Sequence, residues 1–287
     1  MTDLITVSDL HFSYPDGTPV LFDINLTIGE QEFVALIGQN GSGKTTLSKC
    51  LNGLLKPTEG SIIVEAIDTR EKGIIKQLVT RVGYVFQNPD HQLFNRTVWD
   101  EIAYGPRNIG LSKEEVRERV EEAAAVAGVR SELFQTHPYF LHKGLRQRVA
   151  IASILAMRPN TIIVDEPTTG QDRPQSIEVM NFLQRLWREE GHSVIIITHE
   201  MRIVADYAER TIALGNGQIL LDGPTREVFA QPDILERTYV EPPQITRLAQ
   251  ALPPMPNDVL SVGEMIESFE ALTNGQPQPA NGAEQDT

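Results

Sequence analysis

Residues 38–45 combine glycines, a lysine and a threonine at a spacing that suits phosphate binding. They read Gly-Gln-Asn-Gly-Ser-Gly-Lys-Thr, the pattern G-x-x-x-x-G-K-T of a phosphate-binding loop (P-loop). Glycines are needed because several backbone N–H groups must point into one concave nest around phosphate oxygens. We expect Lys44 to reach the outer phosphates of a nucleotide and the Thr45 hydroxyl to ligate Mg²⁺. The residues predicted to bind the nucleotide here are Gly38, Gln39, Asn40, Gly41, Ser42, Gly43, Lys44, Thr45 and Thr46.

Two adjacent carboxylates end a second apolar run. Residues 161–164 read Thr-Ile-Ile-Val and are followed by Asp165 and Glu166, which is typical of a buried parallel strand. Ligands of α/β sheets gather at the carboxyl ends of strands, and paired acids there are costly unless they bind or react. We expect Asp165 to hold Mg²⁺ and Glu166 to polarise the water that attacks the terminal phosphate. The structural alternative is a helix-capping Asp165 and a solvated Glu166.

A third apolar run, residues 193–198, ends at His199. A histidine at a strand end can be a satisfied core residue. Because this one ends the third strand of buried type, where the terminal phosphate would lie, we expect His199 to sense that phosphate.

The elements that must position these side chains are those of an α/β fold. The apolar run 33–37 predicts a strand directly before the P-loop, and a helical pattern begins at Lys44. Alternation over residues 4–10 and 21–28 predicts two further strands. Tyr14 follows the first of these, where its ring could stack on an adenine. An ordinary edge-strand aromatic is the alternative, and spacing alone does not decide between them.

The middle of the chain predicts a helical region between further short strands. Residues 61–64 and 81–86 read as strands, and residues 98–126 as helix. We expect an interruption of that helix at Gly105-Pro106. Ser112-Lys-Glu-Glu115 predicts a capping box that opens an amphipathic helix.

Composition limits the classes of function. Of 287 residues, 40% are hydrophobic and 22% charged, which is ordinary for a globular protein. The net charge of −14 argues against nucleic-acid binding, because phosphate neutralisation requires a basic face. Residues 222–287 hold eleven Asp and Glu against three Arg, so −8 of that charge lies there. We expect neither a membrane span nor a secretion signal. We expect the single cysteine, Cys50, to be buried and inert.

With these three motifs at strand ends, residues 4–225 of the chain resemble the nucleotide-binding subunit of an ABC transporter. The resemblance implies ATP and Mg²⁺ as ligands and a dimer of ATPase subunits. It implies that Tyr14 stacks on adenine, that Gln87 touches Mg²⁺ and relays to a membrane partner, and that Glu166 is the catalytic carboxylate. It further implies that His199 is the switch histidine and Asp172 the D-loop aspartate. The implied fold is a P-loop core with an antiparallel β subdomain, an α-helical subdomain and a small C-terminal extension.

A longer match narrows the family. Phe86-Gln-Asn-Pro-Asp-His-Gln-Leu-Phe94, the segment 104–111 and the tail segment 242–249 look like ATPase subunits of energy-coupling factor transporters. That family takes up vitamins and transition-metal ions such as cobalt and nickel. The resemblance implies integral membrane coupling and substrate-binding subunits as partners, and a peripheral position on the cytoplasmic face of the cell membrane.

One motif departs from the family. The ABC signature L-S-G-G-Q-x-Q-R is here Leu141-His142-Lys143-Gly144-Leu145-Arg-Gln-Arg148. In the family this loop contacts the terminal phosphate bound to the opposite subunit, and glycine permits that approach. His142 and Lys143 could instead donate to a phosphate. The alternative is a signature that no longer promotes hydrolysis.

The altered signature leaves several functions open. If this chain pairs with a different ATPase subunit, its signature weakens the site on the partner's P-loop, and only the site built on Lys44 and Glu166 turns over. An identical copy as partner, a regulatory subunit with weak or no hydrolysis, and the ATPase of an ordinary ABC transporter are the alternatives. An ABC-type ATPase acting on ribosomes or DNA would need a second cassette, a coiled-coil insertion or a basic surface, and the sequence shows none of these.

The predicted organisation has three parts. Residues 1–225 form the nucleotide-binding domain, with 87–140 as its helical subdomain. Residues 226–273 form a C-terminal extension with expected helices at 228–235, 245–252 and 259–272, read as dimer-stabilising or as surface decoration. Residues 274–287 lack an apolar pattern and are predicted to be disordered.

Overall fold

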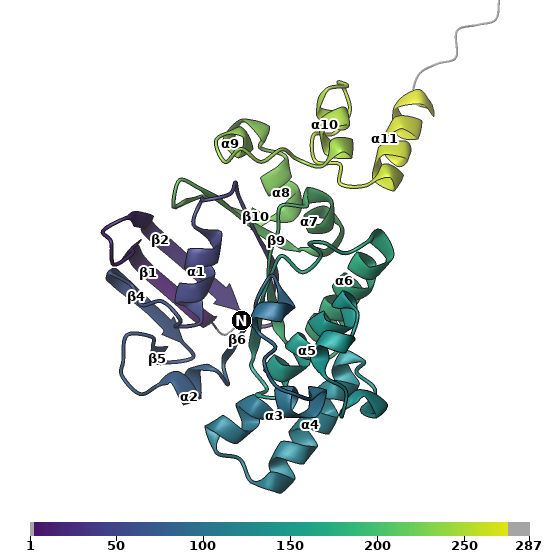
Figure 1. The fold of residues 1–287 in the computed structure, drawn as a ribbon. Helices are drawn as coiled ribbons and strands as arrows, with labels where there is room; N and C mark the ends of the chain where they lie inside the picture. Colours follow the sequence, from purple (N-terminus) through teal and green to yellow (C-terminus); the bar gives the residue numbers. More distant parts are fainter. Residues whose placement is uncertain (1–2, 275–287) are drawn as a thin grey trace, which may run out of the picture.

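The structure is a computed structural model that describes residues 3–274, and it contains two β-sheets with helices around them (Figure 1). The smaller sheet is antiparallel, with strand order β2-β1-β4-β5. Its strands are β1 (Asp3–Ser13), β2 (Pro19–Gly29), β4 (Glu59–Val64) and β5 (Ile67–Asp68). The alternating segments 4–10 and 21–28 lie within β1 and β2, so both predicted strands are confirmed.

The larger sheet has the order β10-β9-β3-β8-β7-β6 and is parallel except for β10. Its strands are β3 (Phe33–Ile37), β6 (Val82–Val85), β7 (Thr161–Asp165), β8 (Ser193–Ile197), β9 (Arg210–Gly215) and β10 (Gln218–Pro224). The three predicted buried strands are β3, β7 and β8, and every residue in them is buried. Because β3, β8 and β7 are direct neighbours, their carboxyl ends meet at one edge of the sheet.

The apolar core lies on both faces of this sheet. Phe33, Ala35 and Ile37 face one cluster, whereas Val34 and Leu36 face the other, as the alternation of a strand requires. Helix α1 (Lys44–Leu51) begins where predicted and covers the second face, together with the antiparallel sheet (Figure 1). Helices α5 (Lys143–Leu155) and α6 (Arg173–Arg188) contribute to the cluster on the first face.

The helical region differs from the prediction in one place. The expected break at Gly105-Pro106 is wrong, because α3 (Val98–Ile109) runs through Pro106 and ends at Gly110, which caps it with φ 95°. Val98, Ile102 and Pro106 are buried along one helix face, so their packing outweighs the hydrogen bond that proline removes. The predicted capping box is present at the start of α4 (Lys113–Ala127).

The remaining short helices connect these elements. They are α2 (Ile75–Leu78), α7 (Met201–Tyr207) and the 3₁₀ turns η1 (Pro89–His91), η2 (Ser131–Leu133) and η3 (Pro138–Phe140). Among residues 3–274, no helix has the length and apolarity needed to cross a membrane.

The C-terminal part forms four helices at one end of the molecule (Figure 1). They are α8 (Thr225–Phe229), α9 (Pro232–Glu236), α10 (Gln244–Gln250) and α11 (Val262–Asn274). The single helix expected over 228–235 is wrong, because Pro232 starts a separate helix and cannot donate a backbone hydrogen bond within the first one. Disorder was predicted for residues 274–287, which is wrong at its first residue, because Asn274 is the last residue of α11. Residues 275–287 lie outside the described part of the chain.

Candidate functional site

The P-loop connects the end of β3 to the start of α1. Gly38 adopts φ 146°, and a Cβ there would lie 2.3 Å from the Leu214 carbonyl oxygen. Gly43 adopts φ 104°, and a Cβ there would lie 2.7 Å from Cδ2 of Leu21. Glycine is therefore required at both positions by backbone conformation and by the closeness of β9 and β2.

Lys44 lies buried within the loop it follows. Its Nζ donates hydrogen bonds to the carbonyl oxygens of Gly38 at 2.7 Å and Gln39 at 2.8 Å. Burial lowers the pKa of the Lys44 ammonium, and the nearby carboxylates of Glu166 and Asp165 oppose that shift. These bonds hold the cation beside the nest, where an anionic ligand would compete with the two carbonyl groups.

A cavity of about 330 Å³ opens above the P-loop. The predicted site residues that line it are Tyr14, Asn40, Gly41, Gly43, Lys44, Thr45, Thr46, Gln87, Asp165 and Glu166. Gly38 and Gln39 line an adjoining cavity, which also contains His199. The buried Ser42 hydroxyl has no hydrogen-bond partner among the described residues. A glycine-rich loop at the N-terminus of α1, a buried lysine and an unpaired hydroxyl fit a phosphate chain.

Asp165 is held by two hydroxyl-bearing side chains. The Tyr84 hydroxyl donates to Oδ2 of Asp165 at 2.7 Å, and the Thr45 Oγ1 lies 3.4 Å from the same oxygen. Burial raises the pKa of Tyr84, and the charge of Asp165 adds to that shift. Among residues 3–274, no group of three His, Cys, Asp or Glu side chains could enclose a metal ion. The oxygens of Thr45 and Asp165 nevertheless fit Mg²⁺, which binds through one or two protein ligands together with substrate phosphates.

Glu166 occupies a strained turn directly after β7. Its backbone adopts φ 49°, in the left-handed region, while its N–H donates to the Ile197 carbonyl oxygen at 2.8 Å. Its Oε1 lies 2.8 Å from Nδ1 of His199, and its Oε2 accepts a hydrogen bond from the Thr169 hydroxyl at 3.1 Å. Its side chain is 11% exposed and that of His199 63%. Because a carboxylate only accepts, His199 donates from Nδ1. A carboxylate held by two donors can take a proton from a bound water.

The tyrosine and glutamine of the predicted site both line the first cavity. The Tyr14 hydroxyl is 3.1 Å from Oγ1 of Thr46, and the Tyr14 ring packs edge-on against Phe12. Gln87 follows β6 and lines both cavities, together with P-loop residues and Glu166.

The signature residues are engaged within the chain. Nδ1 of His142 accepts a hydrogen bond from the Leu145 amide at 3.3 Å, so the ring caps the N-terminus of α5. Nζ of Lys143 donates to the Thr169 carbonyl oxygen at 2.7 Å. Leu141 is buried. None of residues 141–144 is among the described residues lining the cavity with Lys44 and Glu166.

Asp172 also serves as a helix cap. Its side chain accepts a hydrogen bond from the Gln175 amide at 2.9 Å, at the start of α6. It lies outside the residues that line the two cavities.

Comparison with known proteins assigns this chain to a family. The family model described as ABC transporter matches residues 21–169. The chain belongs to the ABC transporter family. Two relatives are energy-coupling factor transporter ATP-binding proteins of Caldanaerobacter subterraneus. EcfA2 is 44% identical over 94% of this chain and 98% of that protein. EcfA1 is 40% identical over 93% and 99%.

Further comparisons agree with this assignment. A putative ABC transporter ATP-binding protein of the same organism is 48% identical over 92% of this chain. The present chain spans only 45% of the length of that protein. The structure of cbiO1 from Clostridium perfringens, part of the ABC transporter complex cbiONQ, is 33% identical and superposes with a TM-score of 0.74. It covers 93% of this chain and all of cbiO1. A dimeric post-hydrolysis cassette bound to ADP and phosphate is 29% identical, with a TM-score of 0.69, over 77% of this chain and 98% of that cassette.

Several residues that build the candidate site were not predicted from the sequence. Tyr84 and Thr169 hold the two carboxylates, and Val20 lies in the wall of the first cavity. Tyr84 had a usable signal, because it lies in a strand that ends just before Gln87. Tyr239, which lines the second cavity, comes from the C-terminal part of the chain and had none.

Proposed function

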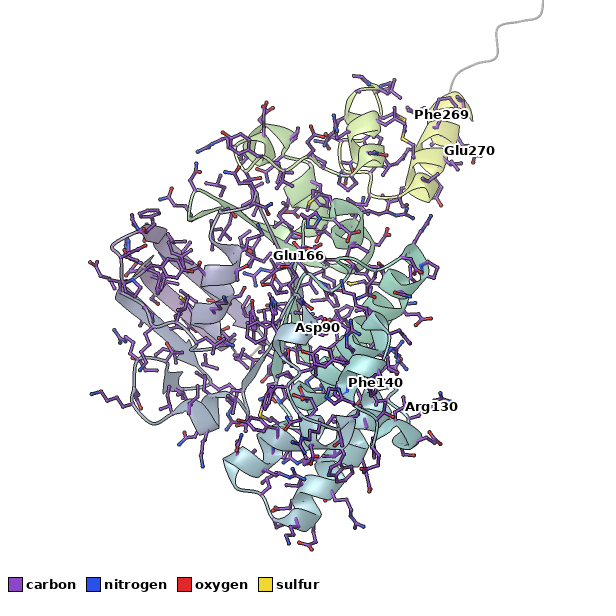
Figure 2. The ribbon with its side chains drawn as sticks, viewed as in Figure 1. Asp90, Arg130, Phe140, Glu166, Phe269 and Glu270 are labelled. Atoms are coloured by element: carbon purple, nitrogen blue, oxygen red, sulfur yellow. The ribbon has the colours of Figure 1, made fainter. Side chains whose placement is uncertain are left out.

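We propose that this chain binds and hydrolyses ATP to energise the import of a vitamin or transition-metal ion through an energy-coupling factor transporter. The observation that carries the ATPase function is the Glu166–His199 pair, whose atoms lie 2.8 Å apart beside the P-loop. Figure 2 labels Glu166 near the middle of the molecule, between the antiparallel sheet and helices α5 and α6. The names of the relatives support the class of transporter.

The roles proposed for the site residues follow from their positions. The P-loop amides and Lys44 bind the phosphates, and Tyr14 stacks on adenine. Thr45, Gln87 and Asp165 would hold Mg²⁺, which would neutralise phosphate charge when bound. Glu166 accepts the proton of the attacking water, and the Nδ1–H of His199 orients that carboxylate. The left-handed turn at Glu166 directs its carboxylate toward His199 while its amide continues the bonding between β7 and β8.

We further propose that the working unit pairs this chain with a different ATPase subunit. The cavity around Lys44 and Glu166 lacks a signature loop of its own among the described residues, so another chain completes it. Lys143 donates one N–H to the Thr169 carbonyl oxygen of this chain, and His142 uses Nδ1 as the acceptor that caps α5, so the signature offers a partner's phosphate no serine hydroxyl and a lysine that is already engaged. One site then hydrolyses ATP and the other turns over weakly. ATP favours closure of the pair because it binds the closed state more tightly.

The division of the chain and its place in the cell belong to the same proposal. Residues 1–225 form the nucleotide-binding domain, residues 87–140 its helical subdomain and residues 226–273 an extension that stabilises the dimer. The chain acts as a peripheral subunit on the cytoplasmic face of the cell membrane, beside integral coupling and substrate-binding subunits. Copurification tests this, because a pair of identical permease subunits in place of those two would indicate an ordinary ABC transporter.

The substitution Glu166→Gln tests the ATPase function. It keeps the size of the side chain but removes the proton acceptor, so turnover of the purified complex should fall about a hundredfold or more while ATP binding is retained. Glu114→Gln, on the exposed face of α4, is the matched control and should keep full turnover. If most activity survives in Glu166→Gln, the assignment of the active site is wrong.

A regulatory subunit is the second candidate, because the signature is altered. It predicts ATP binding without turnover of the Glu166 site in the full complex. Two results together would favour the regulatory subunit. Glu166→Gln would leave turnover of the complex unchanged, and inactivation of the partner's own site would abolish all activity.

A further inference from the structure

The C-terminal part of the chain touches the nucleotide site through one short segment. Residues 237–241, here called the strap, connect α9 to α10. Thr238 and Val240 point inward and are buried, and the Thr238 hydroxyl donates to the Leu235 carbonyl oxygen at 2.7 Å. Tyr239 between them is turned outward and is 74% exposed. The strap is therefore anchored on its buried side and presents its backbone and Tyr239 to the site.

The strap binds the P-loop by a backbone hydrogen bond. The Gln39 amide donates to the Thr238 carbonyl oxygen at 3.2 Å. The carbonyl oxygen of Gln39 accepts from Nζ of Lys44 at 2.8 Å. The Gln39 backbone is thus held by the strap through its N–H and by the lysine through its C=O. When phosphate draws Lys44 away, two bonds still hold this residue: its N–H donates to the strap, and its C=O accepts from the Ser42 amide at 3.2 Å. Only the first of them ties the loop to another part of the chain.

The backbone of Tyr239 is strained in a way that serves this bond. Its φ of 54° lies in the left-handed region, which a bulky aromatic residue rarely adopts. Rotation about this φ turns the peptide plane that carries the Thr238 carbonyl, so the strained turn directs that carbonyl at Gln39. Tyr239 also lines a cavity of about 550 Å³ with Gln39, Glu166 and His199. The strain therefore lies at the nucleotide site rather than in a remote loop.

We propose that the strap is a positioning element of the nucleotide site, through which the C-terminal extension sets the affinity of the P-loop for ATP. An ordered loop binds more tightly, because less conformational entropy is lost on binding. The proposal rests on the ATP site proposed above. It assigns to residues 237–241 a role in the P-loop's own geometry, in addition to any role of the extension in pairing two chains.

Two substitutions at one position test the backbone role. Valine is β-branched and disfavours the left-handed region, whereas glycine adopts it freely. We expect Tyr239→Val to weaken binding of ATP with Mg²⁺ about threefold to tenfold, the range of one net hydrogen bond. It should also speed deuterium exchange of the Gln39 amide in the nucleotide-free chain. Tyr239→Gly should lose clearly less in both quantities than Tyr239→Val, because glycine keeps the backbone conformation.

Two further variants make the test specific. Gln31 precedes β3 at the end of the sheet opposite the P-loop and has φ 52°, so Gln31→Gly relieves similar strain elsewhere and should change neither quantity. Thr238→Val keeps the shape of the side chain but removes the hydroxyl that anchors the strap, so it should weaken ATP binding and speed exchange if Tyr239→Val does not fold.

The outcomes separate this proposal from the one on which it rests. If the parental chain and its complex bind no ATP, the proposed function is wrong. If the parent binds ATP, and Tyr239→Val and Thr238→Val both retain parental affinity and exchange, the strap has no positioning role. Equal losses in Tyr239→Gly and Tyr239→Val would also overturn it, because the Tyr239 side chain would then be responsible.

Discussion

At the N-terminus of α5, an imidazole performs the capping that a hydroxyl performs in the usual ABC signature. Nδ1 of His142 accepts from the Leu145 amide at 3.3 Å, and the same amide also donates to the His142 carbonyl oxygen at 3.0 Å, so the ring adds a second acceptor at the helix end. A serine hydroxyl can accept from the helix and still donate to a ligand, whereas the ring places its remaining N–H on Nε2, on the far side of the imidazole. The substitution therefore keeps the helix cap and changes what the loop can offer to a phosphate.

This assignment predicts different effects of two substitutions at His142. His142→Ala should lower the free energy of unfolding by about 0.5–2 kcal/mol, the cost of losing an N-cap. His142→Ser should stay close to the parent, because its hydroxyl accepts from the same amide. Urea unfolding of the isolated chain measures both. If alanine and serine are equally destabilising, the contribution of His142 comes from ring packing rather than from the cap.

At the scale of elements, His192 links the N-terminal ends of the neighbouring strands β7 and β8. It precedes β8, and its Nδ1 lies 2.8 Å from the carbonyl oxygen of Pro159, just before β7. Burial lowers the pKa of His192 from the ordinary 6.5, and the Pro159 carbonyl and Glu190 oppose that shift. The neutral ring therefore supports the native pairing of β7 with β8.

Stability should consequently fall on mild acidification. The unfolded chain takes up a proton at His192 as the pH falls through 6.5, whereas the folded chain resists it. The stabilisation is thus fully present above that pH and is lost as the pH falls toward the lower, folded pKa. His192→Asn keeps an N–H donor but does not titrate. Its free energy of unfolding should change less than the parent's between about pH 7.5 and about pH 5.5. Equal changes in the two proteins would contradict this.

Elements that are determined by neighbouring residues in the sequence could be predicted, and elements that are determined by contacts between distant residues could not. Strands β3, β7 and β8 and the capping box of α4 depend on neighbouring residues, and each lies where the sequence places it. The course of α3 through Pro106 depends on packing, which local proline chemistry cannot reveal. The same holds within the site. The spacing of its residues identifies the P-loop in the sequence. Tyr239 lies beside the P-loop only because the chain folds back some 200 residues later.

At the scale of the whole molecule, the proposed ATP site is completed by a second chain. The cavity containing Lys44 and Glu166 and the loop 141–144 do not meet among the described residues. The C-terminal extension ends at the periphery of the molecule with helix α11, where Figure 2 labels Phe269 and Glu270 far from Glu166. Bonds from Arg226 to Glu264, at 2.9 and 3.0 Å, attach α11 to α8. The extension can therefore reach a partner at its outer end while its strap contacts the P-loop.

The asymmetric pair makes a prediction that only the assembled complex can test. In a Glu166→Gln background the site on this chain's P-loop does not hydrolyse ATP. Any remaining turnover then comes from the site on the partner's P-loop. Adding His142→Ser, Lys143→Gly and Leu145→Gln restores the family signature. Serine keeps the cap of α5, and glycine lets the helix N-terminus approach the phosphate. Turnover should then rise about tenfold, the effect of one recovered hydrogen bond to a charged group.

The matched control places the same three substitutions in the parental background with the partner's own site inactivated. Turnover should then stay unchanged, because the site on Lys44 and Glu166 uses the partner's signature and not its own. A rise in this control would mean that residues 141–145 act within their own chain. No rise in the Glu166→Gln background would mean that the altered signature does not limit the second site, and a complex holding two copies of this chain with two equally active sites would contradict the asymmetry outright.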